Sequence, residues 1–372
     1  MKTTPLDRCA LEDILAGATF LGSGGGGPRV VGQMIIDSLV AAGTLPALVA
    51  PADLDDGACG AMSAFAGSPD DASSGTFDWS PATRAFAELS AQAQRAGEPA
   101  LSFVVPVELG GGNSFIPLAV AASLPTPLPV LDAAGARRAV PSLAETTFAE
   151  AGLAISPMVL ASPTDVMSVT VSSATVADNV LRAVVGGAAG FGNEAGVAAW
   201  TMRGAAARAA SIPQATTYAR GLGAALRAAA PDAKVEAALA YTGGFLLARG
   251  TVAAVAVETA GGFDHTTVEL ACDDGSTVRV FSQNENLVAY SSRRPAPLAL
   301  APDLLCYLTE AGVPFSNADA ELAVGTRMAL IGVPAPAAMR TPYFIAQFQL
   351  DLQGLGYGGP WVPVEELTTR MA

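Results

Sequence analysis

The sequence predicts an α/β fold in two domains: an N-terminal three-layer α/β domain with a mostly parallel sheet, and a C-terminal antiparallel β-barrel-like domain. The chain has 372 residues, enough for two or three domains, and 51% of it is hydrophobic. Apolar runs alternate with helical patterns up to about Ala230, which is typical of a parallel sheet covered on both faces. We therefore assign residues 1–240 to the first domain and 241–340 to the second, and expect 341–372 to pack back on the first.

The N-terminal region reads as a helix, a glycine-rich turn and a second helix. Residues 8–20 place apolar side chains at helical spacing, and Asp7 precedes them as a candidate N-cap. The loop Gly22–Gly27 follows, and Pro28 then stands where a first helical residue is expected.

Further strands and helices alternate up to residue 230. We expect a buried strand at 101–107, which runs directly into Glu108-Leu-Gly-Gly-Gly-Asn113, and another at 128–133. Helices are expected at 81–96, 114–124 and 174–185.

The pattern of apolar and polar residues changes after about Val235. Residues 243–333 consist of short β-branched runs separated by turn residues, and Asp274-Gly275 between two such runs indicates a hairpin. This pattern predicts the second, antiparallel domain.

Charge and hydropathy exclude several partners. The net charge is −14, from 20 Lys and Arg against 34 Asp and Glu, so the basic footprint of a nucleic-acid binder is missing. No stretch reaches 18 uninterrupted apolar residues, and acids interrupt the N-terminal region that a signal peptide keeps apolar. We expect a cytoplasmic protein that binds a small-molecule substrate and no membrane. Few charges and much alanine favour a homo-oligomer.

The loop Gly22–Gly27 has the spacing of the G-x-G-x-x-G motif of dinucleotide-binding proteins. A dinucleotide site needs a strand before that motif, whereas a helix pattern precedes it here, and no phosphate-binding lysine follows. Neither NAD nor ATP is therefore expected. Two readings remain: a tightly turned connection, or a main-chain wall through which Gly24, Gly25 and Gly26 contact a substrate.

Glu108 and Asn113 are the strongest candidates for chemistry. They follow a buried strand and precede a helix, which is where open α/β sheets place ligand sites. Glu108 could act as a general base, with Asn113 and the N–H groups of Gly111 and Gly112 as polar anchors. The alternative is an ordinary strand-to-helix turn with a solvated glutamate.

Two further clusters are candidates of lower rank. Asp132 ends the next strand and could share a cleft with Glu108, while Arg138 could bind a substrate carboxylate; an ordinary turn with a salt bridge is the alternative. Asn284 and Glu285 end a β run of the second domain and could reach across the interface, or could cap a turn. The single histidine, His265, excludes a multi-histidine metal site, but a divalent metal on carboxylates alone stays open.

Together these segments resemble the S-methyl thiohydantoin desulfurase-like family, whose members are associated with hydantoinase-type enzymes. The resemblance rests on the order of several motifs over nearly the whole chain: Leu21-Gly-Ser-Gly-Gly-Gly-Gly27, Pro106-Val-Glu-Leu-Gly-Gly-Gly-Asn113, Asp132 to Phe148, Gln283-Asn-Glu-Asn-Leu287, Pro302-Asp-Leu304, and Gly356-Tyr357 with Val362-Pro-Val-Glu365. It implies the two domains described above. It also implies hydrolysis of a five-membered cyclic amide, in which water attacks an S-methyl thiohydantoin, methanethiol leaves and a hydantoin remains.

On that resemblance Glu108 is the expected base, Asp132 the second choice, and Asn113 with the glycine N–H groups the expected donors. The sequence also departs from the family pattern. Ala134 and Ser142 stand where acids are usual, and Arg137 where glycine is usual. Ala134 and Ser142 favour a rival hypothesis, a catalytically silent small-molecule binding protein or an accessory subunit of a hydantoinase-type complex.

Overall fold

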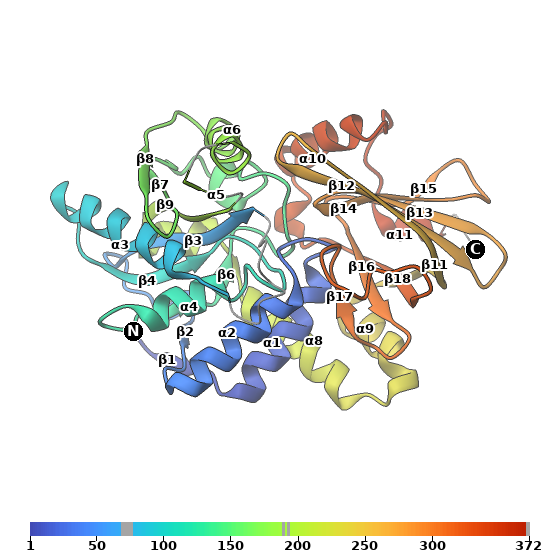
Figure 1. Cartoon of the computed structure of the whole chain (residues 1–372), viewed down its shortest axis with the longest axis horizontal. Coiled ribbons are helices and arrows are strands. Elements are labelled where there is room, and N and C mark those ends of the chain that lie inside the picture. Colours follow the sequence, from blue (N-terminus) through green and yellow to red (C-terminus); the bar gives the residue numbers. More distant parts are fainter. Residues whose placement is uncertain (68–76, 188–189, 192–193, 370–372) are drawn as a thin grey trace.

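The structure is a computed structural model that describes residues 1–67, 77–187, 190–191 and 194–369. An eight-stranded mixed sheet forms the N-terminal part, and an eight-stranded antiparallel sheet forms the C-terminal part (Figure 1). The mixed sheet has the strand order β1-β2-β5-β4-β3-β9-β7-β8. Its strands are β1 (Thr3–Pro5), β2 (Ala47–Val49), β3 (Cys59–Gly67), β4 (Leu101–Pro106), β5 (Val130–Leu131), β7 (Met158–Ala161), β8 (Val166–Val169) and β9 (Glu194–Arg203).

The centre of this sheet is parallel, as the apolar runs predict. β2, β5, β4 and β3 pair in parallel, while β1 joins one edge and β9, β7 and β8 the other in antiparallel fashion. The α/β fold class is thus confirmed, and the antiparallel additions on both sides are a feature that the alternating pattern did not predict.

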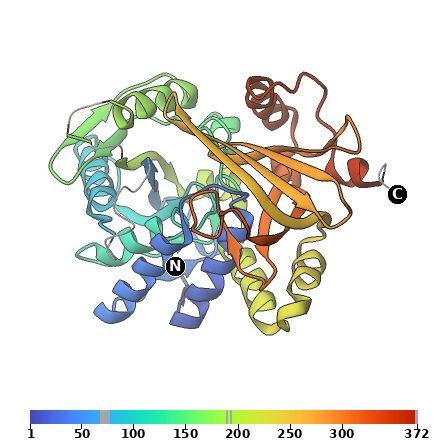
Figure 2. The same cartoon turned by 45° about the vertical axis from the view of Figure 1, so that its right-hand side comes forward.

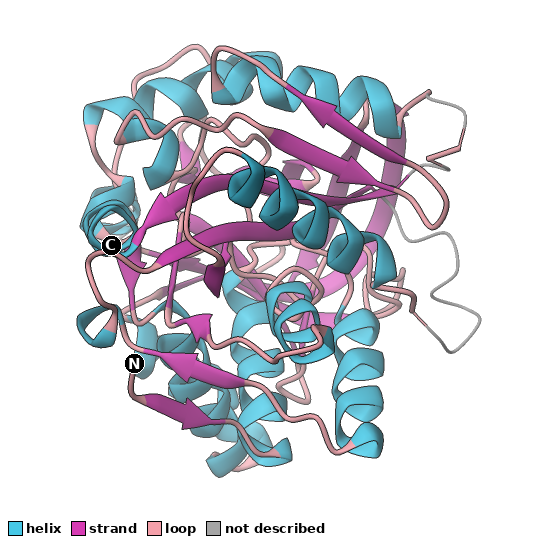
Figure 3. Ribbon diagram, turned by 90° about the vertical axis from the view of Figure 1, so that its left-hand side faces the viewer, coloured by secondary structure: helices cyan, strands magenta, loops and turns pink. Residues whose placement is uncertain are grey.

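Helices cover both faces of the mixed sheet, which makes three layers (Figure 3). On one face, α3 (Ser80–Arg95) and α4 (Ile116–Ser123) bury Phe86, Leu89 and their neighbours in a common core. On the other, α6 (Ala174–Val185) and α7 (Gly204–Ala210) pack on a second core around Trp200. Burial on both faces is why the central strands are continuously apolar.

The predicted helix–glycine turn–helix is present at the N-terminus. Asp7 caps α1 (Arg8–Leu21) by accepting a hydrogen bond from the Ala10 N–H at 2.8 Å. Pro28 is the residue before α2 (Arg29–Ala42) rather than its first residue. α1 packs closely on α8 (Ala215–Ala228), and its end directs the glycine loop toward the second domain.

The antiparallel sheet has the order β15-β14-β13-β12-β11-β18-β16-β17. Its strands are β11 (Phe245–Ala260), β12 (Phe263–Cys272), β13 (Thr277–Gln283), β14 (Glu285–Ser291), β15 (Pro297–Leu300), β16 (Leu304–Thr309), β17 (Pro314–Phe315) and β18 (Arg327–Val333). β14 also approaches β16, so the sheet curls toward a barrel without closing. The predicted hairpin at Asp274-Gly275 joins β12 to β13, with Gly275 at φ 78°.

The hairpin of β11 and β12 is the longest element of this sheet and carries its turn toward α6 of the first domain (Figure 2). The contact is direct, because the Arg182 side chain of α6 donates a hydrogen bond to the carbonyl oxygen of Gly262 in the hairpin turn at 3.1 Å. The two domains therefore meet at this tip as well as at the glycine loop.

The C-terminal segment contacts both domains. The Tyr343 hydroxyl of α10 (Pro342–Gly354) donates to the Ala144 carbonyl oxygen at 2.8 Å, whereas α11 (Val364–Thr369) packs on β15 and β11. The remaining short elements are β6 (Ala133–Ala134), α5 (Thr147–Glu150), β10 (Ile212–Pro213) and α9 (Lys234–Thr242). Among the described residues, no helix is long and apolar enough to cross a membrane.

Candidate functional site

A cavity of about 540 Å³ lies between the two domains and gathers most of the sequence candidates. The first domain supplies the glycine loop, the end of β3, the segment after β4, the loop 140–143 and one side of α6. The second domain supplies the β11–β12 hairpin tip, the turn between β13 and β14, and residues 316–318. The site is therefore built from loops, strand ends and one side of a helix, which the packing of the two domains brings together.

Glu108 lies in this cavity and is only 6% exposed. Its Oε1 accepts a hydrogen bond from Asn113 Nδ2 at 2.8 Å, and its Oε2 accepts one from the Val140 N–H at 2.8 Å. Asn113 is held in turn, because its Oδ1 accepts from the Phe65 N–H at 3.0 Å. Burial raises the pKa of Glu108 from 4.5 to about 7 against the effect of both hydrogen bonds. Asn113 thus orients the carboxylate.

Glu285 is the second carboxyl group of the cavity and comes from the other domain. It is 4% exposed, and its Oε2 has no hydrogen-bond partner among the described residues. Burial, followed by the charge of Glu108, raises the pKa of Glu285 to about 8. A Cβ added to Gly25 would lie 2.1 Å from Glu285 Oε1, so the bare backbone of the loop is what lets this carboxyl group approach.

The two glycine motifs of the sequence lie against each other. A Cβ on Gly110 would lie 2.4 Å from the Cα of Gly26, and the N–H groups of Gly112 and Asn113 both donate to the Gly26 carbonyl oxygen at 2.9 Å. Gly24, Gly25 and Gly26 line the cavity as expected. Gly111 and Gly112 do not, because they pack on the backbone of Gly27 and Arg29 behind it. Gly111 and Gly112 therefore lie behind the cavity wall, and their expected contact with substrate stays a prediction.

Asn284 lines the cavity beside Glu285, as its position after a β run suggests. It has a left-handed backbone at φ 58°, and its Oδ1 accepts from the Asp264 N–H at 2.8 Å. Its carbonyl oxygen accepts from Asn317 Nδ2 at 2.8 Å. Asn284 therefore shapes the turn that presents Glu285. Asn284 has the capping role that the sequence suggested, and Glu285 reaches across the interface to the glycine loop.

Two predicted site residues lie outside the cavity. Asp132 accepts hydrogen bonds from the N–H and the hydroxyl group of Thr217, at 2.9 and 2.5 Å, at the start of α8. Arg138 is fully buried and donates to carbonyl oxygens of Pro302, Asp303 and Asn286 in the second domain at 3.0 to 3.1 Å. Asp132 thus caps α8, and Arg138 joins the two domains. These contacts do not support the expectation that the two residues act on substrate, which stays a prediction.

Arg182 was not predicted and, among the residues that the structure describes, is the one cation that lines the cavity. Its Nε donates to Asp178 Oδ2 at 3.3 Å, its Nη1 to the Gly262 carbonyl oxygen at 3.1 Å and its Nη2 to the Pro141 carbonyl oxygen. Its guanidinium lies 3.8 Å from the centre of the Phe263 ring. Arg182 sits in the middle of an amphipathic helix pattern, so the sequence offered no signal that separates it from a solvated surface arginine.

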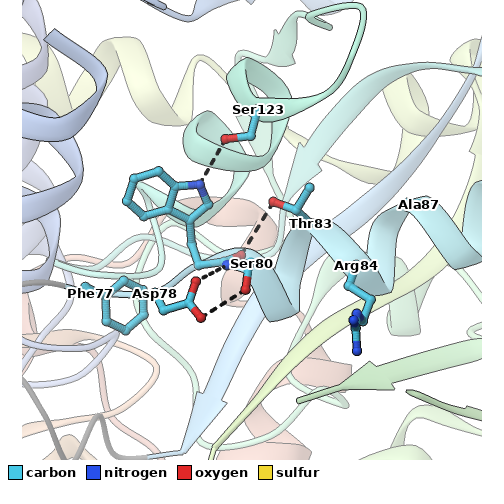
Figure 4. A pocket seen from close by; sticks show the side chains of 8 residues that line it. Phe77, Asp78, Ser80, Thr83, Arg84, Ala87 and Ser123 are labelled. Atoms are coloured by element: carbon cyan, nitrogen blue, oxygen red, sulfur yellow. Dashed lines mark hydrogen bonds between the residues drawn. The ribbon is translucent and has the colours of Figure 1, made fainter. Parts of the chain in front are cut away.

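A second, shallower hollow lies at the start of α3, and its polar groups mostly bond to one another (Figure 4). Asp78 accepts from the N–H and hydroxyl group of Ser80 at 2.8 and 2.9 Å, and Trp79 Nε1 donates to Ser123 Oγ at 2.9 Å. No group of three or more His, Cys, Asp or Glu side chains suited to a metal occurs in the described part of the chain. The candidate site is therefore the interdomain cavity.

The raised pKa values predict a pH-dependent stability. An unfolded glutamate loses its proton near pH 4.5, whereas Glu285 in the folded protein holds its proton up to about pH 8. The folded state thus binds more protons in this window, so the free energy of unfolding should fall as the pH rises from 4.5 to 8. Urea unfolding at pH 5 and pH 8 measures this loss, and Glu285→Gln should show a smaller one. An unchanged pH dependence in the variant would contradict the burial of an ionisable carboxyl group here.

Fold and site define the class of protein: a two-domain α/β protein whose interdomain cavity holds a buried carboxyl pair and the arginine Arg182. The chain belongs to the S-Me-THD-like family, since models of its N-terminal and C-terminal domains match residues 9–172 and 172–360. It is also similar to a crystal structure of a protein from Chromobacterium violaceum, with 30% identity and a TM-score of 0.84 over 97% of this chain and 99% of that one. No curated protein matches the chain.

Proposed function

We propose that the protein hydrolyses a five-membered cyclic amide of the S-methyl thiohydantoin type, releasing methanethiol. The observation that carries this proposal is the pair Glu108 and Glu285, two buried carboxyl groups of one cavity in different surroundings: Glu108 accepts two hydrogen bonds, whereas Glu285 Oε2 has no partner among the described residues. Two titratable groups whose environments separate their pKa values suit a general base and a general acid. Membership of the S-Me-THD-like family supports the same ring class.

Glu108 is the base, because the hydrogen bonds from Asn113 and Val140 orient its carboxylate and favour the ionised form. It takes a proton from water while the water oxygen bonds to the ring carbon that carries the S-methyl group. Glu285, still protonated, donates to the adjacent ring nitrogen. The C–S bond then breaks, methanethiolate takes the proton from Glu108, and the new hydroxyl group returns a proton to Glu285 as the carbonyl forms.

Main-chain groups of the glycine loop are suited to stabilise charge on the ring. Gly26 and Gly27 line the cavity, and neither N–H group has an acceptor within the described residues. Successive backbone N–H groups in such a loop form a concave donor site for negative charge.

The two pKa values predict a bell-shaped pH dependence of kcat/KM. The reaction needs Glu108 ionised and Glu285 protonated, so activity should rise through about pH 7 and fall through about pH 8. The two groups titrate as a coupled pair, so the profile belongs to both. Initial rates of methanethiol release between pH 5 and 10 measure it. A rate that keeps rising above pH 9 would exclude a protonated glutamate as the acid.

The decisive experiment separates turnover from binding. Purified protein is incubated with S-methyl thiohydantoins, and methanethiol is trapped with a thiol reagent while hydantoin is followed by chromatography. Thermal shifts with the same compounds and with hydantoins are measured in parallel. Release of both products supports the proposal. Stabilisation without turnover supports the rival hypothesis of a binding protein or accessory subunit. Ser142 favours this rival, because it stands in the cavity wall in place of an acid.

A further inference from the structure

Asn286 stands directly after Glu285, near the start of β14, and its side chain is fully buried. Its Oδ1 accepts three hydrogen bonds from side chains of the second domain: from Ser282 Oγ at 2.7 Å, from Asn317 Nδ2 at 3.0 Å and from the Tyr307 hydroxyl group at 3.1 Å. Its Nδ2 donates to the Leu305 carbonyl oxygen at 2.8 Å. Three donors on the oxygen and an acceptor for the nitrogen hold the amide group in one orientation.

The glycine loop rests on this residue. The Asn286 N–H donates to the Ser23 carbonyl oxygen at 2.7 Å. Leu305, which accepts from the Asn286 side chain, donates its N–H to Ser23 Oγ at 2.8 Å. A Cβ on Gly24 would lie 2.6 Å from both Cγ and Oδ1 of Asn286. The first residues of the loop are therefore packed against a buried amide group that is held in place.

Glu285 lies against the same loop, one residue further along. A Cβ on Gly25 would lie 2.1 Å from Glu285 Oε1, whereas Glu285 Oε2 has no hydrogen-bond partner among the described residues. The position of this carboxyl group therefore depends on its own main chain and on the glycine loop. Asn286 links the two, because it follows Glu285 in the chain and also contacts Ser23 and Gly24.

We propose that Asn286 is a positioning residue, which sets the distance between the Glu285 carboxyl group and the glycine loop. Gly26 and Gly27 of that loop line the cavity, whereas Asn286 lies behind the cavity wall and acts through its neighbours. Its part in the reaction rests on the proposed function, but the surroundings of Glu285 can be measured without turnover. A residue that only held the two domains together would change stability alone.

The test follows the Glu285 carboxyl group by carbon-13 NMR, with its signal identified by its absence in Glu285→Gln. In Asn286→Ala the loop loses its support and water reaches the carboxyl group, so the pKa of Glu285 should fall from about 8 to below about 7. Glu108, Arg138 and Arg182 are the charged groups that act on Glu285, and all three are unaltered in the variant.

Gly24→Ala tests the same contact from the side of the loop and keeps the side-chain hydrogen bonds of Asn286. Its methyl group would push the loop away from that amide, so the pKa of Glu285 should fall here too. This variant decides the question if Asn286→Ala does not fold.

Ser156→Ala is the control for lost stability. It removes two hydrogen bonds of 2.7 Å between Ser156 Oγ and the main chain of Val171, in the first domain and away from the cavity. This variant should lose stability and leave the pKa of Glu285 unchanged. An unchanged pKa in the folded Asn286 and Gly24 variants, or an equal fall in Ser156→Ala, would overturn the proposal.

Methanethiol release separates the positioning role from the proposed function. If Asn286→Ala lowers kcat about tenfold with KM little changed, and moves the falling limb of the pH profile to lower pH, both are supported. A lower pKa of Glu285 without turnover by the unaltered protein supports the positioning and overturns the reaction. Turnover by the unaltered protein, with kcat and the pH profile unchanged in Asn286→Ala, supports the reaction and overturns the positioning.

Discussion

Glu108→Gln should abolish methanethiol release while leaving the protein folded. The amide keeps the shape of the side chain and can still bond to Asn113 or Val140, but it cannot accept a proton from water. Loss of a positioned general base typically lowers the rate by about 10²- to 10⁴-fold. Because the substitution removes a buried ionisable group, the variant should also be at least as resistant to urea as the unaltered protein at pH 8. Initial rates and an unfolding curve on the same preparation measure both effects.

Asp132→Asn is the matched control. Asp132 is also a buried carboxylate at the end of a strand, but it caps α8 through Thr217 outside the cavity. We expect a loss of about 1 kcal/mol in stability with kcat unchanged per folded molecule. Full activity in Glu108→Gln, or a comparable loss of kcat in Asp132→Asn, would remove Glu108 from the proposed role.

Gly110→Ala should damage both stability and activity. The added methyl group would lie 2.4 Å from the Cα and 2.5 Å from the carbonyl oxygen of Gly26. These are backbone atoms and cannot rotate away, so the two glycine segments must separate, at a cost of about 1–3 kcal/mol. Glu108 lies two residues earlier, and a shift of about 1 Å at a reacting group can lower turnover about 100-fold. Urea midpoints and kcat measured together test this expectation.

The control for that variant is Gly57→Ala. A Cβ at Gly57 meets nothing within 4 Å, so it tests the loss of a glycine without the close approach. Its stability should change by less than about 0.5 kcal/mol and its activity not at all. If Gly110→Ala behaves like Gly57→Ala, the contact between the two glycine segments does not hold the site together.

Local patterns were sufficient for most of the fold. Asp7 before an apolar 3.6-residue repeat predicted the start of α1, and the continuous apolar run 101–107 predicted the buried strand β4. Asp274-Gly275 predicted the β12–β13 hairpin. These signals work because capping, burial on two faces and tight turns each depend on residues that are close in sequence.

Local patterns also located one half of the candidate site. A glutamate after a buried strand, followed by glycines and an asparagine, predicted Glu108 and Asn113, and both lie in the cavity. The same logic did not place Asp132 in the cavity, since the end of a parallel strand can face a helix start as readily as a cleft. Arg138 also lies outside the cavity, because a buried arginine can satisfy its donors on carbonyl oxygens alone.

By itself, then, the sequence determined the two-domain α/β architecture, the glycine loop between two helices and the position of Glu108. Only the tertiary structure decided that Glu285 shares its cavity, that Arg182 is its cation, and that the glycine loop is the surface against which Gly110 and Glu285 lie. The reason is physical: Glu108 and Glu285 are 177 positions apart (285 − 108), and their pKa values depend on burial and on each other's charge. Both quantities exist only once the two domains have packed together.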